Sequence, residues 1–251
     1  MLNKKLCFVL ILGILSFDLA FALTSYEILN KIRDSLTLLH DSPTGAIDAD
    51  GKYTKGSNDG LNCSGFAKWI IDGFYYPLAK NDEEKYISIQ RLREKHFAER
   101  GTRDILVYEE SRDPYFGLDW TRNLAVELGK KRGENSSYKT YDVTDSTISE
   151  YVPNCGYPLS KIEAVLIEQE KLRPGRIYLG SVNGMYGSEP SLWQHYHVVV
   201  FVPFYEDGVL RIAVLERNKE TSFVYLQKRY PQTYCHLVYI STEGEFELMQ
   251  P

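Results

Sequence analysis

The sequence has no cluster of basic residues, few cysteines and, beyond its first 22 residues, no long apolar run. Lysine and arginine number 29 against 34 aspartate and glutamate residues, which makes the net charge −5. An acidic chain without basic runs argues against nucleic acid as a partner. The later apolar segments are too short to cross a bilayer, and the chain contains neither an internal repeat nor a low-complexity segment.

The first 22 residues have the organisation of a secretory signal peptide. Two lysines precede an apolar run over residues 6–17, and Ala20-Phe21-Ala22 is a small-residue cleavage pattern. The run is short for a membrane span, and an uncleaved anchor is the alternative. We therefore predict an exported protein, periplasmic or secreted, with no membrane span once residues 1–22 are removed.

Residues 23–251 are expected to form the mature protein, a single domain with three cysteines, Cys63, Cys155 and Cys235. An odd number of cysteines in an exported protein leaves at least one thiol free. We interpret Cys63 as a free thiol. Cys155 and Cys235 are either paired with each other or buried separately.

Cys63 stands between a loop rich in small polar residues and an apolar helical pattern. Phe66, Trp69 and Ile70 recur at the spacing of one helix face, which predicts a helix from Cys63 to about Tyr75. The thiol then lies in the first turn, where unpaired N–H groups and the positive end of the helix dipole stabilise a thiolate. We predict that Cys63 is a nucleophile; the alternative is a small core residue.

The front half of the chain is predicted to be helical and the back half to form strands. Helices are expected over 25–39, 81–100, 118–131 and 160–171. Strands are expected over 176–180, 196–204, 209–217, 222–226 and 235–241. This order predicts an α+β fold with N-terminal helices and the cysteine helix packed on an antiparallel sheet of about five strands. We interpret residues 78–170 as a helical insertion, with solvated faces on its charged helices.

A base for the thiol is expected at the start of strand 196–204. His195 and His197 are two residues apart, so both are predicted to lie on one face. A two-residue hairpin turn at Asp207-Gly208 places His197 opposite Asn218 and diagonal to Glu216. We predict His197 as the base, oriented by Glu216 or Asn218, and His195 as the alternative base or a cleft residue. A one-residue bulge would change this arrangement.

A zinc site is the rival interpretation of these residues. Cys63, His195 and His197 would supply three ligands. The short Cys/His spacing of zinc sites is absent around Cys63, so we expect no metal and no other cofactor.

Four short motifs resemble, in the same order, those of the NlpC-type cysteine peptidases, which are bacterial cell-wall hydrolases with a papain-like fold. Asn62-Cys63-Ser64-Gly65-Phe66 resembles the family's Asp-Cys-Ser-Gly box, and residues 172–177 resemble its Leu-x-Pro-Gly-Asp-Leu motif. Residues 197–201 resemble its His-Val-Gly-Ile-Tyr strand. Val214-Leu215-Glu216 stands where the family has an apolar pair followed by a polar residue.

The resemblance covers about residues 50–76 and 172–220 and implies a papain-like cysteine hydrolase. It implies three catalytic residues: Cys63, His197 and Glu216. It also implies substrate-binding residues on the cysteine side: Tyr53, Asn62 and Ser64.

The expected function is an exported cysteine hydrolase that cleaves an amide bond in peptidoglycan stem peptides through an acyl-enzyme. Its expected partner is a peptide or a peptidoglycan fragment. The alternative is a catalytically inactive periplasmic binding or scaffold module on the same fold. The family's Tyr-x-Trp-Gly-Gly run is absent before the cysteine, and the stretch between the cysteine helix and the sheet is long. Both departures favour the alternative.

Overall fold

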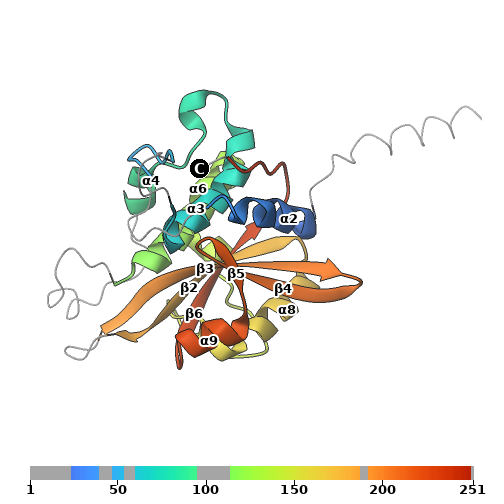
Figure 1. Ribbon diagram of the computed structural model, residues 1–251. Coiled ribbons are helices and arrows are strands. Elements are labelled where there is room, and N and C mark those ends of the chain that lie inside the picture. The colour runs from blue at the N-terminus through green and yellow to red at the C-terminus, as the bar shows by residue number, and fades with distance from the viewer. Residues whose placement is uncertain (1–23, 40–46, 54–59, 95–113, 187–191, 250–251) are drawn as a thin grey trace, which may run out of the picture.

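The computed structural model describes residues 24–39, 47–53, 60–94, 114–186 and 192–249 (Figure 1). The predicted signal peptide lies outside these ranges. Within them, no helix combines the length and the apolar character that a bilayer span requires.

A six-stranded antiparallel sheet with the order β1-β6-β2-β3-β4-β5 forms the centre of the molecule. The strands are β1 (Tyr157–Pro158), β2 (Arg176–Tyr186), β3 (Leu192–Glu206), β4 (Val209–Glu216), β5 (Lys219–Thr221) and β6 (Tyr234–Ser241). Strands adjacent in sequence from β2 to β5 are adjacent in space, as short hairpin connections require.

Helices cover both faces of the sheet. Within the described ranges the α-helices are α2 (Ser25–Leu36), α3 (Cys63–Tyr75), α4 (Ile89–Glu94), α6 (Phe116–Lys131), α7 (Tyr138–Tyr141), α8 (Ile162–Leu172) and α9 (Phe223–Arg229). Short 3₁₀ turns span Tyr76–Leu78, Asp82–Glu84 and Leu159–Lys161. Figure 1 shows α2, α3, α4 and α6 on one side of the sheet and α8 and α9 on the other.

Each face of the sheet has its own hydrophobic core. Val198 and Val200 of β3 pack with α2, α3 and α6, whereas Val199 and Phe201 pack with α8 and α9. This alternation follows from the two-residue period of a strand. The structure confirms the predicted α+β class and the antiparallel sheet.

Several predicted elements differ from those observed. Residues 222–226 were expected to be a strand, but α9 begins here: Ser222 caps the helix by accepting a hydrogen bond from the Tyr225 N–H at 3.2 Å. Phe223 and Leu226, three residues apart, then face the core. The helix expected over 81–100 is observed as a 3₁₀ turn followed by the short helix α4, and residues 95–100 lie outside the described residues.

Helix α6 contradicts the expectation of solvated faces on the charged helices. Every residue from 117 to 129 is buried. The polar ones have internal partners: Asn123 donates to the Leu92 carbonyl at 2.9 Å, and the Trp120 indole donates to the Ser64 carbonyl at 2.9 Å. Helix α6 is therefore part of the core and contacts the first turn of α3.

Candidate active site

The Cys63 thiol lies in the first turn of α3 and is partly exposed. Asn62 caps this helix: its Oδ1 accepts hydrogen bonds from the Gly65 N–H at 2.8 Å and the Ser64 hydroxyl at 2.9 Å. The cap fixes where the helix starts. It therefore holds the thiol where free backbone N–H groups and the helix dipole favour a negative charge.

His197 and Glu216 form a buried hydrogen-bonded pair beside this thiol. His197 Nε2 lies 2.6 Å from Glu216 Oε2, and the two residues are 3% and 1% exposed. The other oxygen, Oε1, accepts a hydrogen bond from the Thr221 hydroxyl at 2.8 Å. Because Glu216 occupies Nε2, Nδ1 is the nitrogen that remains for the hydrogen bond with Cys63.

The strand register that the hairpin predicted is confirmed. Val200 pairs with Leu215 and Glu206 with Val209 across β3 and β4. Glu216 therefore lies diagonal to His197 on the same face.

Charge effects within this group stabilise a thiolate and an imidazolium. Burial raises the pKa of Cys63, but the hydrogen bond and charge of His197, the Val198 N–H and the charge of Arg217 lower it below its ordinary value. Burial lowers the pKa of His197, but its hydrogen bonds with Cys63 and Glu216 raise it overall. Burial also opposes ionisation of Glu216, yet the bond with His197 leaves its pKa below the ordinary value. Cys63 and His197 are thus both biased toward their charged forms.

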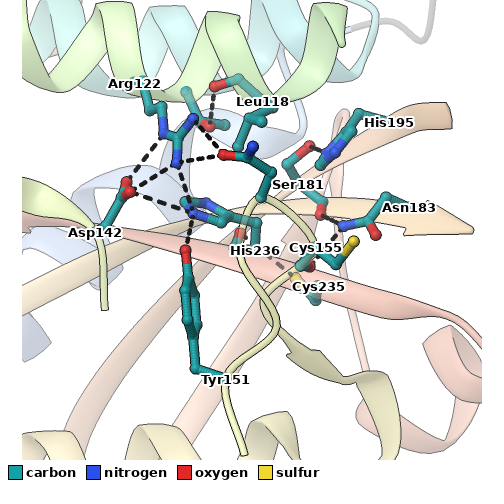
Figure 2. A network of polar contacts seen from close by, with 12 residues as sticks. Leu118, Arg122, Asp142, Tyr151, Cys155, Ser181, Asn183, His195, Cys235 and His236 are labelled. Carbon is teal, nitrogen blue, oxygen red and sulfur yellow. Dashed lines mark hydrogen bonds and ion pairs between the residues drawn. The ribbon is translucent and has the colours of Figure 1, made fainter. Parts of the chain in front are cut away.

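His195 does not share a face with His197, contrary to the prediction. The register of β2 and β3 shifts at this point, so that Val182 pairs with His197 and Asn183 with His195. Because Val182 and Asn183 are consecutive, their partners lie on opposite faces of the sheet. Figure 2 shows His195 in its own environment, where Nδ1 lies 2.9 Å from the Ser181 hydroxyl. His195 is therefore not an alternative base for Cys63.

The zinc interpretation fails for the same reason, since Cys63, His195 and His197 do not converge. Across the described ranges, no group of three or more His, Cys, Asp or Glu side chains is arranged to hold a metal ion.

A polar network lies beside His195 (Figure 2). Arg122 of α6 donates to both oxygens of Asp142, at 3.1 and 2.7 Å, and lies 3.3 Å from His236 Nε2. The Tyr151 hydroxyl lies 3.1 Å from the same nitrogen. This network connects α6 to β6 and to the loop before β1, and sequence reasoning missed it because its members are far apart in the chain.

Asn218 and Tyr53 do not occupy the predicted positions. Asn218 donates to the Leu39 carbonyl at 3.2 Å and so does not orient His197. The Tyr53 hydroxyl donates to Asp72 at 2.8 Å, next to the ion pair between Asp72 and Lys68. Asp72 is about 13 Å along α3 from the thiol at 1.5 Å per residue. Tyr53 therefore supports the far part of the helix.

Asn62 and Ser64 have structural roles at the start of α3, because their polar groups bond to each other and to the helix. Cys155 and Cys235 are both free thiols, so the predicted alternative of a disulfide is wrong; Cys235 is buried, whereas Cys155 is half-buried.

Three residues near the site were not predicted: Thr221, Arg217 and Tyr230. Thr221 follows Glu216 across the tight turn into β5, and that turn holds Arg217 at a φ of +54°. The Tyr230 ring centroid is 5.1 Å from that of His197. The position of Thr221 near Glu216 could have been predicted from the tight turn between the two strands. The position of Tyr230 could not, because Tyr230 follows α9, which the sequence pattern predicted to be a strand.

Comparisons with family models, with curated proteins and with solved structures found no match to this chain. The chemistry of the site therefore rests on its geometry. A thiol at a helix start, an imidazole and a carboxylate in hydrogen-bonded sequence are the parts of a nucleophilic site for acyl transfer.

Proposed function

We propose that this protein is an exported cysteine hydrolase that cleaves an amide bond through a Cys63–His197–Glu216 site. The observation that carries the proposal is the continuous hydrogen-bonded series from the thiol through His197 to Glu216. The same three residues were selected from the sequence, and the lowered pKa of Cys63 together with the raised pKa of His197 supports their use in catalysis.

The reaction would proceed in two steps. The Cys63 thiolate attacks the amide carbonyl carbon, and the Cys63 backbone N–H at the start of α3 stabilises the oxyanion. His197 then gives its proton from Nδ1 to the leaving amine, and the C–N bond breaks to leave a thioester. In the second step His197 takes a proton from water, whose oxygen attacks the thioester and releases the acid and the thiolate. Glu216 keeps the imidazole ring oriented and stabilises its positive charge.

The substrate class and the detailed fold belong to the proposal as well. The four NlpC-like motifs support a papain-like fold and a substrate among peptidoglycan stem peptides. The signal-peptide pattern of residues 1–22 supports export to the compartment where such peptides occur.

Iodoacetamide labelling of Cys63 across pH tests the activated thiol. We expect fast labelling below pH 7 in the otherwise native protein, no labelling of this position in Cys63→Ala, and markedly slower labelling in His197→Ala. Cys155→Ala is the matched control, because burial raises the pKa of Cys155 to about 11 and leaves it unreactive at this pH. Labelling of Cys63 only above pH 8, unchanged in His197→Ala, would contradict the proposal.

An inactive binding or scaffold module is the second candidate. The residues that were expected to bind substrate favour this candidate, because the side chains of Tyr53, Asn62 and Ser64 all form hydrogen bonds within the protein. Incubation with muropeptides separates the two: retention of intact peptide without release of a new amine supports the module, and release that stops in Cys63→Ala supports the hydrolase.

A further inference from the structure

A pocket of about 850 Å³ opens at the end of the sheet away from Cys63, where β2 begins and β3 and β6 end. We call it the sheet-end pocket. The end of α6 and the start of α2 complete its lining. Phe204, in the lining, is about 23 Å along β3 from His197 at 3.3 Å per residue. Its volume is that of a site for a small ligand or a short peptide, and it is separate from the candidate active site.

Arg176 provides an available hydrogen-bond donor in this pocket. Its guanidinium lies over the Tyr239 ring, 3.8 Å from the centroid, which leaves the N–H edges for another partner. No described residue forms an ion pair with this guanidinium. The other two arginines of the lining are engaged: Arg132 donates to backbone carbonyls at 3.1 and 2.8 Å, and Arg173 pairs with Asp145. Arg176 is thus the arginine available for a ligand.

Glu170 lies close to Arg176 but is largely uncharged in mildly acidic solution, where it does not offset the charge of Arg176. The side chain is 4% exposed; Oε1 accepts a long bond of 3.4 Å from the Gly175 N–H, and Oε2 has no hydrogen-bond partner among the described residues. Burial raises the pKa of Glu170 to about 7, although the Gly175 and Arg176 backbone and the charge of Arg176 act against the rise. The other ionisable groups next to Glu170 and Arg176 are Tyr178, Arg173 and Asp145. The pocket lining adds Arg132, Glu134, Tyr141, Tyr239 and Glu243. At pH 6, therefore, Glu170 is largely uncharged and does not offset the charge of Arg176.

The rest of the lining indicates what kind of anion fits. Tyr26 stacks on Phe204 with ring centroids 5.7 Å apart and provides an aromatic surface on one side. Arg33, which pairs with Glu220, lies over the Phe204 ring. Glu134 and Glu243 add negative charge to the lining, so a polyphosphate or another polyanion would be repelled. An organic molecule with a single carboxylate satisfies both conditions, and a guanidinium edge binds a carboxylate with two parallel hydrogen bonds.

We propose that the sheet-end pocket binds the C-terminal carboxylate of a short peptide through Arg176. This site does not depend on the proposed hydrolase: no step of the Cys63 chemistry uses it, and it is tested in a protein that lacks the thiol.

The test is calorimetric titration of the full chain carrying Cys63→Ala with N-acetyl-alanyl-alanine at pH 6. We expect saturable binding, no binding of the same peptide with a C-terminal amide, and an affinity roughly tenfold or more lower in Arg176→Gln, as expected for the loss of a charge-assisted pair. Arg211→Gln is the matched control, because Arg211 is exposed on β4 outside the pocket and should have no effect. Circular dichroism checks that each variant is folded.

Repeating the titration at pH 8 tests the role assigned to Glu170. Ionised Glu170 then neutralises Arg176, so the affinity should fall several-fold, whereas Glu170→Gln should bind equally at both pH values. Three results would overturn the proposal: no saturable binding up to 20 mM peptide, roughly equal binding of the amide, or binding unchanged by Arg176→Gln. Binding of inorganic phosphate in place of the peptide would overturn the choice of a peptide carboxylate.

Discussion

At the scale of single residues, Glu216 determines how His197 faces the thiol. Its Oε2 engages Nε2 at 2.6 Å, and Thr221 fixes its other oxygen. A buried carboxylate held in this way orients the imidazole and stabilises its positive charge. Glu216 is therefore a positioning residue that acts on Cys63 only through His197.

Glu216→Gln tests this positioning role. Loss of the negative charge removes an interaction that raises the pKa of His197, so the thiolate should form less readily. We expect the pH midpoint of iodoacetamide labelling at Cys63 to rise by about one unit, which corresponds to roughly a tenfold loss of labelling rate at low pH.

The control for this experiment is Glu220→Gln. Glu220 stands on the neighbouring strand β5 and pairs with Arg33 at the surface, away from His197. Replacing Glu220 should leave the pH midpoint of Cys63 labelling unchanged. Equal midpoints for Glu216→Gln and the native protein would show that Glu216 has no influence on the thiol.

At the scale of elements, α3 joins the chemistry to the core. Its first turn carries the thiol, and its later turns are buried against the other helices of this face. The start of the helix depends on Asn62, whose side chain satisfies the Gly65 N–H at 2.8 Å. The stability of α3 and the lowered pKa of the Cys63 thiol therefore both depend on the Asn62 cap.

Asn62→Ala should lower both properties, whereas Asn62→Asp should separate them. Alanine removes the cap, which costs about 1 kcal/mol of unfolding free energy, and frays the turn that stabilises the thiolate. Aspartate keeps the cap but adds a negative charge next to Cys63, so stability should be retained while the pKa of the thiol rises. Urea denaturation and pH-dependent labelling measure the two effects; a stable Asn62→Ala protein would contradict the capping role.

At the scale of the whole molecule, buried histidines on opposite faces of the sheet respond to pH in opposite ways. Burial lowers the pKa of His236, and the nearby Arg122 charge adds to this, although Asp142 acts in the other direction. His236 is therefore neutral in the folded protein and must gain a proton on unfolding in acid. His197 has a raised pKa and behaves in the opposite manner.

The pH dependence of each contribution to stability follows from the difference between the folded and unfolded pKa of the group. The stability that depends on neutral His236 is complete above pH 6.5 and is lost as the pH falls below that value toward its folded pKa. The contribution of His197 is complete below pH 6.5 and is lost as the pH rises through its folded pKa. Glu170, whose pKa is raised to about 7, favours the folded state at low pH and so opposes His236 between pH 4.5 and 6.5.

His236→Gln isolates one of these contributions. Between pH 6.5 and 5 the unfolding free energy of this variant should depend less on pH than that of the native protein, by up to about 1.4 kcal/mol per pH unit. His197→Gln should instead change the dependence above pH 6.5. Urea denaturation at pH 5, 6, 7 and 8 provides the measurement, and equal slopes for native protein and His236→Gln from pH 6.5 to 5 would refute the assignment.

Local signals in the sequence determined much of the arrangement at Cys63. Asn62 and the apolar period after it predicted where α3 starts, and the turn at Asp207-Gly208 predicted the register that brings Glu216 to His197. Both signals act over a few residues, because a cap bonds within one helical turn and a tight turn sets the pairing of the strands it joins. These two signals therefore brought Cys63, His197 and Glu216 together in the prediction, with Asn218 left as the alternative to Glu216.

Only the tertiary structure decided the features that depend on distant partners. The register shift that moves His195 to the other face arises between β2 and β3, and nothing in the residues around His195 signals it. The burial of α6 requires hydrogen-bond partners for its polar groups, such as the Leu92 carbonyl for Asn123. Tyr53 likewise donates a hydrogen bond to Asp72, which lies on another element. Such contacts join segments that are far apart in the chain, and packing rather than local propensity selects them.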